Sequence, residues 1–283
     1  MRKSIVLLQQ NLKLNNMKIK QLTVATLLLL LATSCGEKRQ DFPFRNPDLP
    51  LEERIDDLLS RLTPEEKVGQ MMNTTPAIER LGIPAYDWWN EALHGVARAG
   101  QATVFPQAIA LAATFDDEAV HETFTMVSDE ARAKYHQYQR DKEYDRYKGL
   151  TFWTPNINIF RDPRWGRGME TYGEDPYLTE KMGVAVVRGL QGDDPAYLKT
   201  HACAKHYAVH SGPEWNRHEF DVEVSPRDLY ETYLPAFEAL VKEADVQEVM
   251  CAYNRFEGKP CCGSDRLLID ILRNGWGYDG IIV

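Results

Sequence analysis

Segments with the composition of β-strands alternate with segments of helical pattern along most of this chain, and this alternation restricts its fold strongly. Such chains favour a parallel sheet with helices packed on its faces, because each helix returns the chain to the same edge of the sheet. Residues 51–283 are also close in number to the roughly 250 residues of a closed barrel of eight strand–helix units. We therefore expect an α/β fold, a (β/α)8 TIM-like barrel.

The alternative is a doubly wound open sheet, but no Gly-x-Gly-x-x-Gly motif follows the first strand to support a dinucleotide-binding version of it. The chain ends inside a strand-like segment, residues 279–283, with no helix after it. Catalytic groups of barrels lie at the C-terminal ends of strands. We therefore expect a barrel that is incomplete at its C-terminal end.

Apolar spacing near 3.6 residues, capping residues and helix-stopping glycines predict the helices. Helices are expected at residues 52–62, 106–113, 116–138, 177–190, 226–244 and 265–274, with another beginning at residue 64. Strands are expected from residue 151 and at residues 201–209, 248–254 and 280–283. The charged run at residues 139–148 is interpreted as a solvated connection.

The segment Thr151–Pro176 combines a strand with a loop suited to a polar ligand. Its glycines at positions 166 and 168 let the backbone approach a ligand closely, Trp165 offers a flat apolar face, and Arg167 presents fixed donors to oxygen atoms. A sugar has this mixture of an apolar ring face and a rim of hydroxyl groups. The alternative interpretation is a solvated surface loop with ion pairs.

The first 35 residues have the features of an export signal. Lys18 and Lys20 precede an apolar run that is too short to cross a bilayer. Residues 32–35 resemble a bacterial lipobox, which predicts that Cys35 is acylated and that the exported chain is lipid-anchored in the periplasm or at the cell surface. The alternative is an ordinary cleavable signal with an incidental cysteine. Residues 36–50 are polar and are predicted to form a linker.

A formal net charge of −9 argues against a nucleic-acid partner, because the chain has no basic stripe to neutralise phosphates. Composition gives no indication of the oligomeric state. Four cysteines follow the export signal, and they are too few to staple a domain of this size by disulfides. We expect them to be buried thiols: Cys203, Cys251, Cys261 and Cys262.

Three motifs in this order and spacing resemble one enzyme family. They are WNEALHG at residues 89–95, WGRGMETYGEDP at 165–176 and AKHYA at 204–208. Together they resemble the N-terminal barrel domain of glycoside hydrolase family 3, the exo-acting β-glucosidases and β-xylosidases, and the resemblance covers residues 51–283.

The resemblance implies a retaining glycosidase without a cofactor, which uses one carboxyl group as nucleophile and another as acid/base. The family's nucleophile is an aspartate shortly after the strand that reads Asp279–Val283 here, and its acid/base is usually a glutamate in a following domain. Residues 1–283 are therefore expected to contain no catalytic carboxylate and to be inactive alone.

The resemblance also implies which residues bind the terminal sugar. Donors to the sugar hydroxyls would be Arg167, Lys205 and His206, with Glu91 as acceptor on the far side of the ring. The walls of the pocket would be Trp153 and Tyr253, and Arg217 would reach the same site with the least certain alignment.

Each of these positions has a simpler alternative. Trp153 suits a core aromatic, His206 a satisfied buried histidine, and Arg167 a partner of Glu170 or Glu174. The spacing of nearby histidines and a cysteine could also indicate a set of metal ligands. We expect no metal site there, because a lysine lies among these residues and strand side chains alternate between faces. The residues of that rejected set are His201, Cys203, His206 and His210.

The identity of residue 91 points to a substrate. Glucosidases of the family typically carry aspartate there, in a motif like GIDAVHG, whereas xylosidase-like members carry glutamate in W-x-E-A-L-H-G. The longer side chain of Glu91 would crowd the hydroxymethyl group of glucose but not xylose. We expect hydrolysis of terminal β-D-xylosyl residues from β-linked xylo-oligosaccharides in plant polysaccharide breakdown. A β-glucosidase and a non-catalytic sugar-binding lipoprotein are the alternatives.

Overall fold

The computed structural model describes residues 42–194 and 196–283. The predicted export signal, Cys35 and the first part of the predicted linker lie outside the described residues. The chain separates into two units, Met1–Thr63 and Pro64–Val283, of which the first is described from residue 42.

The first unit consists of a 3-10 turn, Pro43–Arg45, and helix α2, Leu51–Arg61. The turn lies within the predicted linker. It is tied to the helix because Asp57 accepts hydrogen bonds from the backbone of Phe44, at 3.1 Å, and from the guanidinium of Arg61, at 2.9 and 2.6 Å. The bonds from Arg61 lower the pKa of Asp57. The helix predicted at residues 52–62 is confirmed.

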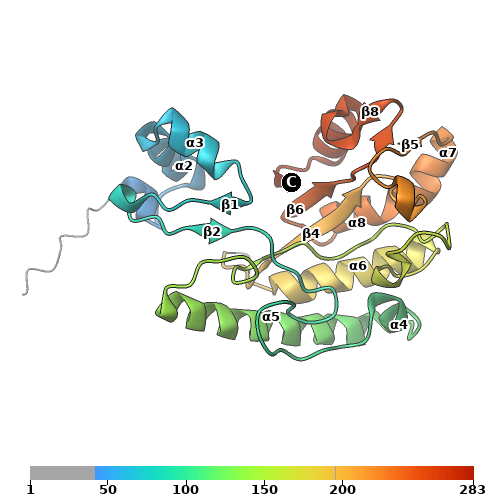
Figure 1. Ribbon diagram of the computed structural model, residues 1–283, viewed down its shortest axis with the longest axis horizontal. Coiled ribbons are helices and arrows are strands. Elements are labelled where there is room, and N and C mark those ends of the chain that lie inside the picture. The colour runs from blue at the N-terminus through green and yellow to red at the C-terminus, as the bar shows by residue number, and fades with distance from the viewer. Residues whose placement is uncertain (1–41, 195) are drawn as a thin grey trace, which may run out of the picture. The chain divides into compact units, whose positions relative to one another are not determined.

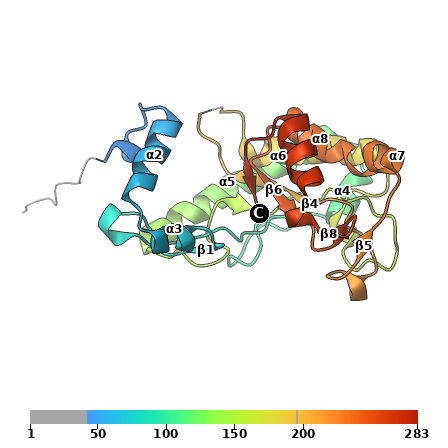
Figure 2. The same cartoon turned by 90° about the horizontal axis from the view of Figure 1, so that it is seen from above.

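The second unit contains a parallel sheet, as predicted. Its described strands, in spatial order, are β3 (Thr151–Phe152), β4 (His201–Tyr207), β6 (Glu248–Cys251) and β9 (Ile281–Ile282). All three neighbouring pairs are parallel, and β4 runs beside β6 in Figure 1. The end of the chain lies beside β6, through the pairing of that strand with β9 (Figure 2). The four described strands of this sheet therefore present their carboxyl ends at the same edge.

Helices follow the predicted ranges closely in the second unit. They are α3 (Pro64–Gln70), α4 (Ala108–Ala112), α5 (Asp117–Asp141), α6 (Pro176–Gln191), α7 (Pro226–Asp228) and α8 (Pro235–Lys242). Local capping explains the starts of the long ones: Asp116 accepts from the backbone of Ala119 at 2.9 Å, and Asp175 from that of Leu178 at 2.7 Å.

Helices α5 and α6 lie side by side (Figure 1). Ser128 of α5 donates to the carbonyl of Gly189 in α6, at 2.9 Å. A Cβ atom at Gly189 would lie 2.7 Å from the carbonyl oxygen of His121, so the two helices can approach this closely only because residue 189 is glycine.

Two predicted helices contain π-helical turns. The segment predicted at 226–244 consists of α7, a π-helical turn at Leu229–Tyr233, and α8. Pro235 has no N–H group to continue an α-helical ladder, so the helix restarts there. The segment predicted at 265–274 is π-helical over Arg266–Gly275.

Two smaller sheets were not predicted in this form. Strands β1 (Thr74–Thr75) and β2 (Tyr86–Asp87) pair antiparallel, and β5 (Asp221–Val222) and β8 (Lys259–Pro260) flank β7 (Arg255–Phe256). Two residues, Glu257 and Gly258, connect β7 to β8, with φ angles of 51° and 78°. Tight hairpins require positive φ at both central residues, and a glutamate in that position gives little sequence signal for it.

The cysteine prediction is right for three residues and wrong for one. Cys203, Cys251 and Cys261 are buried, whereas Cys262 is exposed. Cys262 lies in a 3-10 turn, Cys261–Gly263, which follows β8 at the surface. Its position in a turn explains the difference, because only one of the two adjacent cysteines can face the interior there.

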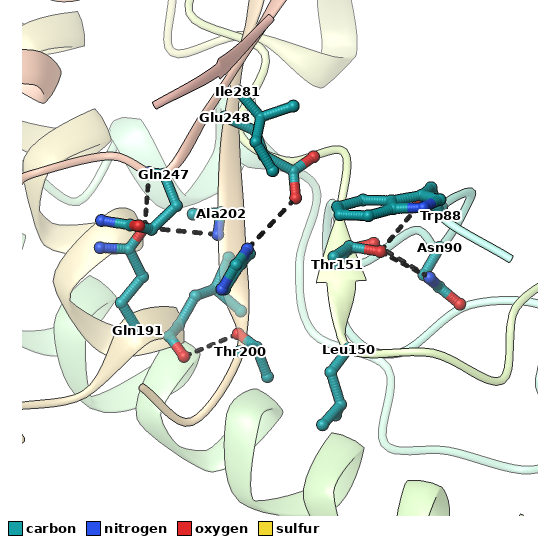
Figure 3. A network of polar contacts seen from close by, with 12 residues as sticks. Trp88, Asn90, Leu150, Thr151, Gln191, Thr200, Ala202, Gln247, Glu248 and Ile281 are labelled. Carbon is teal, nitrogen blue, oxygen red and sulfur yellow. Dashed lines mark hydrogen bonds and ion pairs between the residues drawn. The ribbon is translucent and has the colours of Figure 1, made fainter. Parts of the chain in front are cut away.

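At the amino ends of the strands, a buried acid sits in a network of polar groups (Figure 3). Glu248, the first residue of β6, is fully buried, and His201 Nδ1 lies 3.5 Å from its carboxylate. Among the residues that the structure describes, neither carboxylate oxygen has a hydrogen-bond partner. Burial therefore raises the pKa of Glu248, although His201 opposes the shift.

Candidate functional site

Arg167, in the loop predicted to bind a polar ligand, makes a fork-shaped contact with Glu170. Its Nε donates to Oε1 at 2.9 Å and its Nη2 to Oε2 at 2.5 Å. The third arm, Nη1, lies 3.1 Å from His206 Nε2. The alternative interpretation of Arg167 as a partner of Glu170 is therefore confirmed, and the same side chain also reaches a second predicted site residue.

Asn158 fixes the orientation of His206. The backbone N–H of His206 donates to Asn158 Oδ1 at 2.8 Å, and Asn158 Nδ2 donates to the carbonyl of His206 at 2.9 Å. The same Oδ1 atom lies 3.0 Å from His206 Nδ1, so Nδ1 carries the proton and Nε2 accepts from Arg167. Both ring nitrogens are thus engaged within the protein, and His206 orients Arg167.

Burial and charge set the protonation of the site. Lys205 is 3% exposed, and burial lowers its pKa while the charge of Glu91 opposes that shift. Burial, with Lys205 as the next cause, holds the pKa of His206 well below its usual value, so the ring is neutral. Burial would raise the pKa of Glu170, but the bonds and charge of Arg167, together with the charge of Lys205 and the bond from Asn156, lower the pKa overall. The positive charges of the cationic side chains and the negative charges of the carboxylates therefore offset one another at this site.

Glu91 is held by a stack of aromatic side chains. Trp89 Nε1 donates to Glu91 Oε1 at 2.8 Å. The ring of Trp153 stacks on that of Trp89, with centroids 5.2 Å apart and planes 26° apart. The guanidinium of Arg146 lies 4.6 Å from the centroid of the Trp89 ring. Trp89 is thus packed against both groups, which limits the directions in which the Glu91 carboxylate can point.

Residues 139–148, predicted to be a solvated connection, are all exposed or half-buried, but Arg146 also makes contacts that the prediction did not include. Helix α5 extends to Asp141, and Arg146 also lies 3.6 Å from the carboxylate of Asp87, which is buried. The contact partners of Arg146 lie more than fifty positions earlier in the chain, so the local charge pattern could not reveal them.

Tyr253 and Arg217 lie together beside the histidines. The Tyr253 ring, half exposed, has its centroid 6.3 Å from that of His206 and 6.2 Å from that of His210. The guanidinium of Arg217 lies 5.8 Å from the centroid of Tyr253 and bonds Glu214 at 2.6 Å. These contacts join Tyr253 and Arg217 to the group around Arg167.

His210 is a buried member of this aromatic group. Its Nδ1 atom lies 3.1 Å from Asn254 Oδ1. Burial, opposed by the bond to Asn254, lowers the pKa of His210 to about 4, so the ring is neutral at pH 7. Its Nε2 atom, which then accepts hydrogen bonds, has no partner in the described structure.

The sheet explains why these residues meet. Trp153 directly follows β3, Lys205 and His206 lie near the end of β4, and Tyr253 follows β6. Parallel strands place their carboxyl ends at one edge, where loops carry ligand-binding groups. Several buried polar atoms without a hydrogen-bond partner in the described structure also lie in these segments. They are Nε1 of Trp153 and of Trp165, Nε2 of His210, Oγ of Ser211, Oε2 of Glu214 and Nε of Arg217.

The seven residues predicted to bind the sugar do not all contact one another. Arg167, His206, Tyr253 and Arg217 form a chain of direct contacts, with Lys205 adjacent in sequence to His206. Glu91 and Trp153 belong to the neighbouring stack, and Trp153 also lines a cavity of about 340 Å³ with Trp88 and Val283. The charge of Glu91 acts on both Lys205 and Arg167, which links the two groups.

Sequence reasoning missed three residues that orient the site: Asn158, Trp89 as a donor to Glu91, and Asn254. A buried asparagine in an apolar segment such as NINIF is a signal, because buried amides need partners. The partner itself lies 48 positions away and could not be identified from the sequence.

Within residues 42–194 and 196–283, no group of three or more His, Cys, Asp or Glu side chains is placed to hold a metal ion. In the same described part of the chain, no helix has the length and apolarity needed to cross a membrane.

Comparison with known proteins decides the family. Residues 59–283 match the glycosyl hydrolase family 3 N-terminal domain. The chain belongs to glycoside hydrolase family 3. Among curated family relatives, it is 54% identical over 261 residues to a xylan 1,4-beta-xylosidase of Xylanibacter ruminicola, covering 91% of this chain and 30% of that protein. It is 45% identical to the probable beta-D-xylosidase 7 of Arabidopsis thaliana, covering 85% of this chain and 33% of that protein.

Solved family 3 structures share the fold. A GH3 exo-beta-xylosidase (XlnD), in complex with a xylobiose aziridine activity-based probe, superposes with a TM-score of 0.78 at 36% identity, over 85% of this chain and 32% of that one. A GH3 beta-glucosidase of Bifidobacterium adolescentis superposes with a TM-score of 0.67 at 31% identity, over 79% of this chain and 31% of that one. The chain thus spans about a third of the length of these relatives.

Proposed function

We propose that this family 3 domain binds the terminal sugar in a retaining β-xylosidase that releases β-D-xylosyl residues from xylo-oligosaccharides. The observation that carries the proposal is the group of polar side chains at the carboxyl ends of β3, β4 and β6, with Arg167, Lys205 and Glu91 in one electrostatic neighbourhood. The naming of several relatives as xylosidases supports it.

The geometry suggests how each residue acts. Arg167 and Lys205 present N–H groups in a largely buried setting, where hydrogen bonds to sugar hydroxyls are strong because little water competes. Donors that tighten on the 2-hydroxyl as positive charge develops in the ring stabilise the transition state more than the bound substrate. Glu170 and His206 hold the guanidinium in place, so the enzyme spends little free energy on orienting it during the reaction.

Glu91 is the residue that we propose discriminates xylose from glucose. Trp89 holds one of its carboxylate oxygens, and the stack with Trp153 limits its movement toward the aromatic side. A glutamate fixed in this way leaves less room for a hydroxymethyl group than an aspartate. One such steric difference is worth about 1 to 3 kcal/mol, so we expect activity on β-glucosides to be weaker but measurable.

The test compares aryl β-xyloside and aryl β-glucoside hydrolysis by the protein expressed from its complete gene. Glu91→Asp should shift the ratio of the two kcat/KM values toward the glucoside by about 10- to 200-fold. Glu122→Asp, an exposed position on α5, serves as the control and should leave the ratio unchanged. An unchanged ratio in Glu91→Asp would rule out the steric argument.

Two other candidates remain distinguishable by the same assay. A β-glucosidase, favoured by the solved glucosidases that share this fold, would show the higher kcat/KM on the glucoside with the natural Glu91. A sugar-binding lipoprotein would bind xylose in calorimetry and release no product from either substrate.

We also propose that the parallel sheet is part of a (β/α)8 barrel and that residues 1–35 direct export, with Cys35 carrying a lipid that tethers the protein at the periplasmic or cell surface. The TIM-like family fold supports the first proposal, and the lipobox-like sequence supports the second. Radioactive fatty acid should label the wild type and leave Cys35→Ala unlabelled. Equal labelling of both proteins would remove the anchor.

A further inference from the structure

His210 follows a strained turn just after β4. Its neighbour Val209 has a φ angle of 55°, a left-handed conformation that β-branched residues rarely adopt. Strain of this kind is concentrated where the surrounding structure needs a side chain in one particular place. The side chain placed here is 2% exposed, although both nitrogens of its ring are polar. The backbone at residue 209 therefore indicates that the position of His210 serves a purpose.

Three rings of the candidate site surround His210. Their centroids lie 4.9 Å from its own for His206, 5.7 Å for Trp165 and 6.2 Å for Tyr253. His206 in turn lies 3.1 Å from Arg167, a proposed donor to the sugar. His210 is therefore packed within the proposed sugar-binding group and not in a separate part of the core.

Asn254 fixes the tautomer of His210. The amide nitrogen of Asn254 donates to the carbonyl of Arg255 at 3.0 Å and to that of Ala208 at 3.5 Å, so the amide oxygen is the atom that faces the ring. This oxygen lies 3.1 Å from His210 Nδ1 and can only accept, so Nδ1 carries the proton. In the neutral ring, Nε2 then has a free lone pair and is an acceptor.

Nε2 has no hydrogen-bond partner among the residues that the structure describes. Buried polar atoms are rarely left unpaired, because each one costs free energy comparable to a lost hydrogen bond. On the adjoining ring, Nε1 of Trp165 is a buried donor that likewise lacks a partner within the described chain. An unpaired acceptor and an unpaired donor on neighbouring rings suit a ligand group that both donates and accepts. A hydroxyl group has this property, whereas a carboxylate or a phosphate dianion has no proton to donate to Nε2.

We propose that His210 is a further sugar-binding residue, whose Nε2 atom accepts a hydrogen bond from one hydroxyl group of the terminal sugar. This inference rests on the proposed function and extends it. Arg167 and Lys205 can only donate, so a hydroxyl that accepts from them has to place its own proton on another group. Glu91 is the acceptor already proposed for the far side of the ring. His210 supplies a second, uncharged acceptor.

The experiment is a cycle of variants and substrates, carried out on the protein expressed from its complete gene. His210→Phe removes the acceptor and keeps a flat ring. We measure kcat/KM for an aryl β-xyloside and for its 2-deoxy, 3-deoxy and 4-deoxy forms. On the parent xyloside the variant should lose about 10-fold, because the bound hydroxyl has lost its acceptor. On one of the deoxy substrates the loss should shrink to less than about 2-fold, because that substrate lacks the proton that Nε2 accepts.

Two further variants make the result decisive. His136→Phe changes an exposed histidine of α5 and should leave all four kcat/KM values unchanged. His210→Ala removes the acceptor without filling its space, and it replaces His210→Phe in the cycle if circular dichroism shows that the latter is misfolded. A residue that only supports the structure would lower kcat/KM by the same factor on all four substrates, and this result would overturn the proposal. Wild-type kcat/KM on the parent xyloside would overturn it as well.

Failure of the proposed function would look different. A wild type that prefers β-glucosides, or that binds xylose without turnover, contradicts the β-xylosidase function and does not prevent the cycle. The comparison then uses deoxy forms of the glucoside, or the Kd values of xylose and its deoxy forms from calorimetry. In each case, coupling of residue 210 to a single hydroxyl group supports the role of His210, and equal losses on all ligands overturn it.

Discussion

The two ends of the parallel sheet both bury ionisable groups, but they balance the charge in different ways. At the carboxyl ends, Arg167 pairs with Glu170 and the charge of Glu91 offsets that of Lys205. At the amino ends, Glu248 is fully buried with His201 3.5 Å away, and its oxygens accept no hydrogen bond in the described structure.

This difference shows in the protonation of the acids. Glu170 has a lowered pKa despite its burial, because Arg167 bonds to its charged form. Glu248 has a raised pKa, because burial outweighs the effect of His201. One end is therefore arranged to stay ionised, which suits recognition of a polar ligand, while the other favours a neutral acid.

At the carboxyl ends of the sheet, the largest effect is expected from Arg167→Met. If Arg167 binds the sugar as proposed, removing this partly buried donor should lower kcat/KM for an aryl β-xyloside by about 10²- to 10³-fold, since comparable donors contribute about 2.7–4 kcal/mol to transition-state binding. Steady-state kinetics measure this loss. Arg164→Met is the matched control, because Arg164 lies in the same loop, is 73% exposed and pairs with Asp162. Equal losses in both variants would mean that Arg167 has no special role.

Glu170→Gln sharpens the comparison, because it keeps the shape of the side chain and removes its charge. We expect kcat/KM to fall about 10- to 100-fold, since hydrogen bonds to charged groups contribute about 1.5–3 kcal/mol. Glu174→Gln changes an exposed glutamate of the same motif and should have little effect. If Glu170→Gln retained wild-type kinetics, charge balance at this end would not matter for function.

The smallest expected effect is at the amino ends, where Glu248→Gln should stabilise the protein. Because the folded pKa of Glu248 is raised above its unfolded value near 4.5, stability falls as pH rises from that value through the folded pKa, and the loss persists above it. Relative to the wild type, the variant should therefore gain stability as pH rises, reaching on the order of 1 kcal/mol at pH 7.

Urea denaturation between pH 4.5 and 8 measures this difference. Glu243→Gln, at an exposed position just after α8, controls for the general loss of one negative charge. A Glu248→Gln variant that is less stable than the wild type at pH 7 would show that the buried carboxylate has partners that stabilise its ionised form.

The features of the fold that depend on residues close together in the chain could be predicted from the sequence. The start of α6 follows from Asp175 and Pro176, and its end from Gly192, whose φ is 76°. The parallel sheet followed from the alternation of elements. The gathering of Arg167, Lys205 and Glu91 came from family resemblance, because spacing along the chain does not show which loops meet.

The features that sequence reasoning missed all depend on distant contacts or unusual backbone. Arg146 stacks on Trp89, His206 is oriented by Asn158, and Glu257 adopts a positive φ that its residue type does not favour. In each case the deciding interaction is with a residue or conformation that local composition does not specify.

The stacked indoles of Trp89 and Trp153 have an optical consequence. Rings this close couple their electronic transitions, so the near-ultraviolet circular dichroism of the protein should contain a component from this pair. Since Trp89 also donates to Glu91, a sugar that displaces the carboxylate would change that component. Ligand titrations could then be followed spectroscopically on the unlabelled protein, with Trp153→Leu as the variant in which the signal disappears.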